Sequence, residues 1–141
     1  MKNLLPLIVL ALISFSLAQS VTTADSPEHG SYLTDADGLA LYIFAKDTAH
    51  SGASTCYGDC AAAWPPFTVD AVIETTIGGE FGTLIRDDGS LQATYNGLPL
   101  YYWAGDRNLG DTLGHGVGNV WFVATAEKAS VTSEQASSTD D

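Results

Sequence analysis

The first hydrophobic pattern is an apolar run of fourteen residues from Leu4 to Leu17, preceded by a single lysine. Ser16 and Ala18 place small residues at the two positions that a signal peptidase reads, so cleavage is predicted before Gln19. The run is shorter than the roughly 20 residues of a comfortable membrane span. We therefore assign residues 1–18 as a signal peptide and expect a secreted or periplasmic, soluble product. A retained N-terminal anchor is the alternative.

Farther along, the hydrophobic pattern occurs twice. Gly38–Asp47 and Gly97–Asp106 align at a constant offset of 59 and share six of ten residues. The flanks correspond as well, because residues 30–35 resemble residues 82–87 and each half continues to a tryptophan. Such self-similarity indicates a duplicated structural unit. We expect both copies to form a single domain over residues 30–126.

Within each copy, turn-forming residues separate segments that are rich in aromatic and aliphatic side chains. Asp35–Gly38 and Asp87–Gly89 are turn sequences, and Tyr95–Gly97 adds a third hairpin signal. Many glycines exclude long helices, and one short helical turn is expected near Gly58–Trp64, before two prolines. The predicted fold is an all-β, small antiparallel domain of two pseudo-repeated hairpin units.

Alternation in the first copy indicates how its central strand is covered. Leu41 and Ile43 fall on one face of the strand, and Tyr42 and Phe44 fall on the other. Both faces are apolar, so we expect this strand to be covered on two sides.

The ends of the mature chain offer little to bury. Residues 19–29 and 127–141 are dominated by Ser, Thr, Ala, Asp and Glu, a composition typical of disorder. We expect a flexible N-terminal arm and a disordered acidic tail. For the tail, a short strand centred on Val131 is the alternative.

The charge is strongly acidic, with 17 Asp and Glu against five Lys and Arg and a formal net charge of −12. Loss of Lys2 with the signal peptide would change −12 to −13. Nucleic acids and anionic membranes are bound through clustered Lys and Arg, so neither is an expected partner. The expected partner is an extracytoplasmic ligand or protein.

A recurring motif resembles that of a known family. Both copies fit Tyr-x-(Phe/Trp/Tyr)-x-x-Asp, the signature of a bacterial secreted-repeat family labelled a predicted lipoprotein of unknown function. The motif residues are Tyr42, Phe44 and Asp47 in the first copy and Tyr101, Trp103 and Asp106 in the second. Other matching segments are Cys56–Cys60, Trp64–Pro66, Arg86–Gly89, Thr94–Leu100, Gly110-Asp111 and Gly116–Trp121. The resemblance implies export and supplies no activity. No cysteine for lipid attachment follows the apolar run, which is a departure from the family label.

Two interpretations of the motif are open. An aromatic residue two positions after the tyrosine shares its strand face, and the aspartate lies where the strand turns and can accept backbone N–H groups. This favours a structural role. The alternative is a groove for a sugar, a peptide or a cation, lined by paired aromatic and carboxylate groups. Exposed aromatic rings would support the groove, and burial would remove it.

The two cysteines enclose three residues in a chain that is expected to be exported. A disulfide between Cys56 and Cys60 is the simplest interpretation. The alternative is a copper-handling or thiol-redox protein in which His50 or His115 joins the cysteines, since thiolate and imidazole both suit copper.

Motifs of the common enzyme classes are absent from the sequence. It contains no Gly-x-Ser-x-Gly, no phosphate loop and no His-Glu-x-x-His. Oxygen ligands beside glycine at Asp106–Asp111 make calcium an alternative cofactor, although the spacing is not that of an EF-hand. We predict a non-catalytic binding or interaction module without a cofactor.

Overall fold

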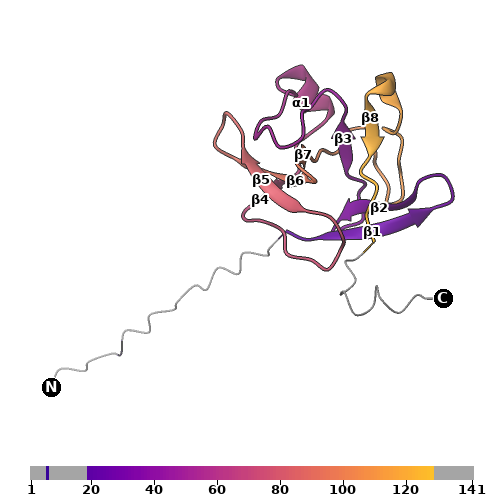
Figure 1. Cartoon of the computed structure of the whole chain (residues 1–141), viewed down its shortest axis with the longest axis horizontal. Helices are drawn as coiled ribbons and strands as arrows, with labels where there is room; N and C mark the ends of the chain where they lie inside the picture. Colours follow the sequence, from indigo (N-terminus) through magenta and orange to yellow (C-terminus); the bar gives the residue numbers. More distant parts are fainter. Residues whose placement is uncertain (1–5, 7–18, 129–141) are drawn as a thin grey trace, which may run out of the picture.

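The structure is a computed structural model that describes residue 6 and residues 19–128. Apart from residue 6, the predicted signal peptide lies outside the described residues, as does the predicted tail from residue 129 onward. Short strands dominate the described part (Figure 1). In chain order the elements are β1 (Val21–Ser26), β2 (Gly30–Asp35), β3 (Tyr42–Phe44), α1 (Asp59–Ala63), β4 (Thr68–Val69), β5 (Phe81–Ile85), β6 (Leu91–Tyr95), β7 (Leu98–Pro99), the 3₁₀ turn η1 (Val117–Asn119) and β8 (Trp121–Val123).

All strand pairs of the described residues are antiparallel. β1 pairs with β2, β3 pairs with β8, and β6 pairs with β4, β5 and β7. The turn between β6 and β7 is Asn96-Gly97, and both residues have positive φ (50° and 83°), as this kind of tight hairpin requires. The predicted all-β class is confirmed, and so is the short helix near Gly58–Trp64.

Two predicted boundaries are wrong. The expected flexible arm over residues 19–29 contains β1, which pairs with β2 along its whole length. The polar sequence of β1 gives no hydrophobic alternation from which a strand could be predicted. Val21 is the only buried residue of β1, and most of its other side chains face solvent. At the other end, Glu127 forms a bridge with Gly78 and donates its N–H to the Tyr95 hydroxyl (2.8 Å). The ordered part therefore includes the first residue assigned to the tail.

The two copies meet at their motif tyrosines through a reciprocal pair of backbone hydrogen bonds. The N–H of Tyr42 donates to the carbonyl of Tyr101 (2.8 Å), and the N–H of Tyr101 donates back to the carbonyl of Tyr42 (3.0 Å). Since these residues occupy equivalent positions in the two copies, the reciprocal bridge shows that the duplication in the sequence is a duplication in space.

The last segment of each copy also forms backbone hydrogen bonds with the other copy. The N–H of Phe67, in the first copy, donates to Leu100 of the second (2.9 Å), and the N–H of Ala124, in the second copy, donates to Leu41 of the first (2.8 Å). β4 pairs with β6 in the same sense, and β8 pairs with β3. The two copies are therefore interlocked and do not lie as separate units.

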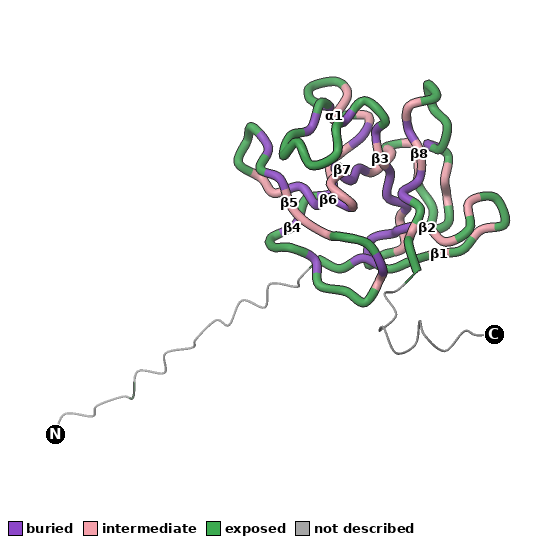
Figure 2. The backbone as a smooth tube through the Cα atoms, viewed as in Figure 1, coloured by how far each residue is buried: buried purple, intermediate pink, exposed green. Residues whose placement is uncertain are grey.

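Two cores lie on opposite faces of the central segments, and the buried residues gather on the inner strands, with exposed residues on the outer loops (Figure 2). Leu41 and Leu100 belong to one core, and Tyr42 and Tyr101 belong to the other, as strand alternation dictates. The aliphatic core comprises Val21, Leu33, Leu41, Phe67, Val69, Ile73, Ala93, Tyr95, Leu100 and Ala124. The aromatic core comprises Tyr32, Ala40, Tyr42, Phe44, Cys56, Trp64, Tyr101, Trp121 and Val123.

Candidate functional site

The tyrosines and aspartates of the repeated motif bond across the two copies. The Tyr42 hydroxyl donates to Asp106 of the second copy, and the Tyr101 hydroxyl donates to Asp47 of the first (2.6 Å). Both tyrosine side chains are completely buried (0% exposed), and burial together with the neighbouring carboxylate raises the pKa of each phenol far above its ordinary value. These hydroxyls therefore stay protonated and act as fixed donors.

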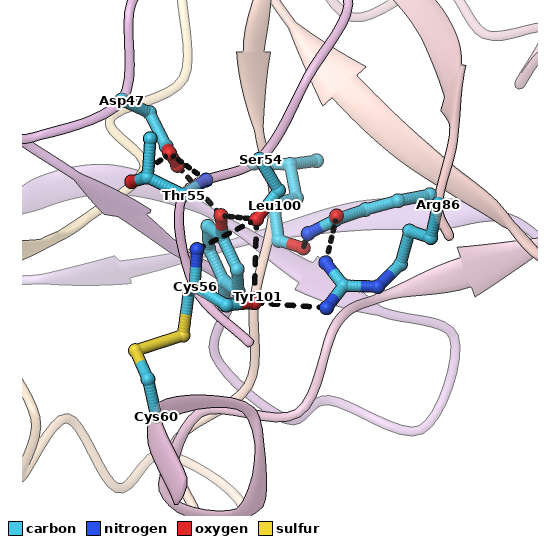
Figure 3. Close-up of a disulfide and its surroundings, with 9 residues drawn as sticks. Asp47, Ser54, Thr55, Cys56, Cys60, Arg86, Leu100 and Tyr101 are labelled. Carbon is cyan, nitrogen blue, oxygen red and sulfur yellow. Dashed lines mark hydrogen bonds between the residues drawn. A yellow bond between two sulfur atoms is a disulfide. The ribbon is translucent and has the colours of Figure 1, made fainter. Parts of the chain in front are cut away.

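Asp47 is enclosed by donors from its own loop as well. Its carboxylate accepts the N–H (2.8 Å) and the hydroxyl (2.7 Å) of Thr55, and Ser54 reaches the hydroxyl of Tyr101 (2.6 Å) (Figure 3). Asp47 is only 7% exposed, and Phe44 of the same copy is 8% exposed. In the first copy, these side chains are therefore buried, and neither the ring nor the carboxylate is exposed for a groove.

Four rings form a continuous stack through the aromatic core. Trp64 and Trp121 stack on each other at 3.9 Å between ring centroids, and each copy contributes one of them. Beyond this pair, Phe44 stacks on Trp121 (4.1 Å), and Trp103 packs on Trp64 (4.2 Å) with the planes tilted by 33°. Trp103 is thus an end ring of the stack, and unlike Phe44 it is only half-buried.

A hollow of about 200 Å³ opens beside Trp103. Its walls are mainly apolar, and both a proline and a second aromatic ring line it. The lining residues are Asp35, Leu39, Ala40, Pro65, Tyr102, Trp103 and Asp106. We call this site the Trp103 hollow. Two members of the motif, Trp103 and Asp106, reach it, so the predicted pairing of aromatic and carboxylate groups is accessible in the second copy only.

Both carboxylates of the Trp103 hollow are held by neutral donors. Asp35 accepts the N–H groups of Asp37 and Leu39 (both 2.9 Å) and the hydroxyl of Tyr102 (2.8 Å). Asp106 accepts the N–H of Leu113 (3.0 Å) besides its bond from the motif tyrosine. Burial raises the pKa of Asp106 above its ordinary value. The hollow therefore has the half-buried carboxylate of Asp106 beside its aromatic rings, and the carboxylate of Asp35 is buried in its wall (8% exposed).

The predicted disulfide between Cys56 and Cys60 is present, and it ties α1 to the loop before it (Figure 3). Cys56 is completely buried, and its carbonyl accepts a hydrogen bond from the guanidinium of Arg86 (2.8 Å), which also donates to Gln92 (2.7 Å). Arg86 comes from the second copy, so this bond fastens the disulfide loop of one copy to a hairpin of the other.

The two histidines of the copper alternative lie in other surroundings. His50 approaches Glu80 (3.9 Å), and His115 packs against the ring of His29 at 4.2 Å and accepts the N–H of Val123 (3.1 Å). Burial, followed by the nearby His29, lowers the pKa of His115. Among the described residues, no group of three His, Cys, Asp or Glu side chains could hold a metal ion. The closed disulfide and these separate surroundings give no support to the copper alternative.

A family model described as a secreted repeat of unknown function matches the chain twice, at residues 23–68 and 82–125. The chain belongs to this family. Each match begins in the first strand of a hairpin, β1 or β5, and ends beyond the tryptophan that joins the central stack. Comparisons with curated proteins and with solved structures gave no match. Among the described residues of this secreted repeat protein, no helix is long and apolar enough to cross a membrane.

Several residues of the Trp103 hollow were not singled out from the sequence. Tyr102 occupies the position of Ile43 in the other copy, so the extra ring was visible as a difference between the copies. Asp35 belongs to a predicted turn, and Pro65 belongs to the proline pair that ends the predicted helical turn and to one of the segments that resemble the family. They meet because the two copies of this secreted repeat protein exchange segments, as the N–H of Tyr102 bonded to the carbonyl of Pro65 (2.7 Å) shows.

Proposed function

We propose that this protein is an exported, non-catalytic binding module whose ligand occupies the Trp103 hollow. The supporting observation is the divergence of the two copies: Phe44 and Asp47 are buried, whereas the equivalent Trp103 and Asp106 line an accessible hollow. A site of this kind, concave and mainly apolar with a few oriented polar groups, is typical of small-ligand binding.

Binding without catalysis agrees with how the polar groups are held. The oxygens of Asp35 and Asp106 are engaged by backbone N–H groups and by tyrosine hydroxyls. Covalent catalysis needs a nucleophile with an activating base within hydrogen-bond reach. The lining of the hollow contains no Ser, Thr, Cys, Lys or His, and the donors that face its carboxylates fix them in place.

The test follows the indole N–H of Trp103 by two-dimensional ¹H–¹⁵N NMR during titration with N-acetylglucosamine, the peptide Gly-Leu-Gly and Nα-acetyl-lysine amide, one at a time. We expect at least one probe to shift this signal saturably. In Trp103→Ala, which lacks the indole, we expect the same probe no longer to shift the backbone amide signals of Tyr102 and Asp106. Tyr57→Ala, at an exposed aromatic residue outside the hollow, is the matched control and should leave binding unchanged. If none of the probes produces a saturable shift, the proposal fails.

A further inference from the structure

We infer that the Trp103 hollow binds a small organic cation, an alkylammonium group on an apolar stem. This inference rests on the proposed function, because it names the ligand class of the same site. It combines three independent properties of the hollow: an aromatic wall, two carboxylates without a cationic partner, and a size and lining that suit carbon better than a metal ion.

The aromatic wall comes from Trp103 and Tyr102. Trp64 packs against Trp103 at 4.2 Å between ring centroids with the planes tilted by 33°, and Trp103 also lines the hollow. The electron-rich face of an aromatic ring attracts a cation, and tryptophan does so most strongly. Gly105 is required next to this ring, since a Cβ at that position would lie 2.3 Å from Nε1 of Trp103. The first copy has Lys46 at the equivalent position, and the ring there is buried.

The two carboxylates, one buried in the wall (Asp35, 8% exposed) and one half-buried (Asp106), carry negative charge without a cationic partner among the described residues. The ion pairs of the described residues are His29 with Glu28 and His50 with Glu80, so neither Asp35 nor Asp106 pairs with a base there. A carboxylate that is partly removed from water and faces only neutral donors carries its charge at a cost in desolvation free energy. A ligand cation would offset that cost. Burial raises the pKa of Asp106, as expected of a carboxylate that lacks a cationic partner.

The size and lining of the hollow favour an organic cation over a metal ion. A calcium ion requires six to eight oxygen ligands, and magnesium requires a regular octahedron of oxygens. The hollow has two carboxylates and a mainly apolar wall, and no group of three acidic, histidine or cysteine side chains in the described residues could hold a metal. Its volume of about 200 Å³ suits a small alkylammonium group.

The charge of the whole chain works in the same direction. A formal charge of −12 attracts cations to the surface over a distance set by ionic strength. That general attraction would serve any cation, whereas the aromatic wall selects an ammonium group that carries hydrocarbon. Selectivity between matched charged and neutral compounds therefore separates the site from the general field of the protein.

The experiment uses the whole mature protein and the same NMR titration. It compares choline with its uncharged isostere 3,3-dimethyl-1-butanol. We expect choline to shift the Trp103 indole signal saturably and to bind at least tenfold more tightly than the alcohol. Asp106→Asn should weaken choline binding several-fold. The matched control, Asp87→Asn, removes the same charge from an exposed turn outside the hollow and should change the affinity little. Circular dichroism establishes that both variants are folded.

The outcomes separate this inference from the proposed function. Equal affinity for choline and the alcohol would overturn the cation inference and leave the hollow as an apolar binding site. Equal weakening by the Asp106 and Asp87 variants would also overturn it, because the attraction would then be that of the whole surface. Binding of the sugar or the neutral peptide without choline would overturn the inference and support the proposed function. No response to any compound would overturn both.

Discussion

At the scale of single residues, the tyrosine and the aspartate of each motif form hydrogen bonds with the aspartate and the tyrosine of the other copy. The tyrosine hydroxyls have no solvent to bond with, so each needs an acceptor inside the protein. Asp47 and Asp106 provide those acceptors, and each aspartate also accepts an N–H from its own loop. The spacing of the motif thus places each carboxylate where it fixes its own loop and also accepts a hydrogen bond from the tyrosine hydroxyl of the other copy.

Removing the hydroxyl of Tyr101, which bonds to Asp47, is therefore expected to destabilise the protein. In Tyr101→Phe the ring remains, but Asp47 and Ser54 lose their shared hydroxyl inside the core. A buried carboxylate that loses a donor costs about 1–3 kcal/mol of unfolding free energy. Urea denaturation measures this loss. Tyr57→Phe removes a hydroxyl from a partly exposed ring and should cost less than about 0.5 kcal/mol. Equal effects of both substitutions would contradict the structural role of the motif.

Asp106 is expected to make stability depend on pH. Burial raises the pKa of its carboxyl despite the hydrogen bonds that it accepts from Tyr42 and Leu113. The folded protein then holds this proton to higher pH than the unfolded chain does, so the contribution of Asp106 to stability is lost as pH rises through the folded pKa. Relative to wild type, Asp106→Asn should gain stability as pH rises from about 4, the ordinary value for aspartate. Urea denaturation at several pH values tests this, and a difference independent of pH would contradict it.

At the scale of elements, the disulfide fixes α1 beside the aromatic core. It closes a loop of only three intervening residues, so it restricts the unfolded chain modestly. In the folded protein, both cysteines also make backbone hydrogen bonds. The carbonyl of Cys56 accepts a hydrogen bond from the guanidinium of Arg86, and the carbonyl of Cys60 accepts one from the N–H of Trp64 (2.7 Å). The disulfide loop therefore holds both the buried guanidinium and the first tryptophan of the stack.

Reduction is expected to destabilise the protein without unfolding it. For a loop this short, the entropy of the unfolded chain accounts for roughly 2 kcal/mol. The strand pairs and the contact of Trp64 with Trp121 involve no atom of the disulfide, so we expect their signals to persist with dithiothreitol while the urea midpoint falls. The double variant Cys56→Ala with Cys60→Ala serves as control, since its stability should not respond to the reductant. Complete unfolding on reduction, or an unchanged midpoint, would show that the loop has a different role.

The sequence predicts the elements better than it predicts their partners. The hairpin turns and α1 follow from local chemistry, since Asp-Gly and Asn-Gly turns and a pair of prolines act within a few residues. β1 was missed because its apolar content is one buried valine, so its stability comes from pairing with β2. The Trp103 hollow was predicted only in part, because Tyr102 and Pro65 are brought together by strand exchange, which no local pattern encodes.

At the scale of the whole molecule, duplication has produced an interlocked pair of copies. The central segment of each copy bonds to the last segment of the other, through β3 with β8 in one direction and Tyr102 with Pro65 in the reverse direction. The central ring stack draws on both copies at every step. One copy alone would expose half of each core and leave its hairpin without the strand that completes the sheet.

Neither copy is therefore expected to fold alone. Fragments of residues 19–77 and 78–128 divide the chain between β4 and β5, and each would lack the strand that the other supplies. We expect both isolated fragments to lack the near-ultraviolet circular dichroism of ordered tryptophans. An equimolar mixture should recover it, because Trp64 and Trp121 then stack on each other. Recovery should depend on concentration, as for any association of two chains. An isolated fragment with dispersed amide signals and cooperative unfolding would show that one copy carries its own core, and the interlocking would then be a consequence of folding rather than its condition.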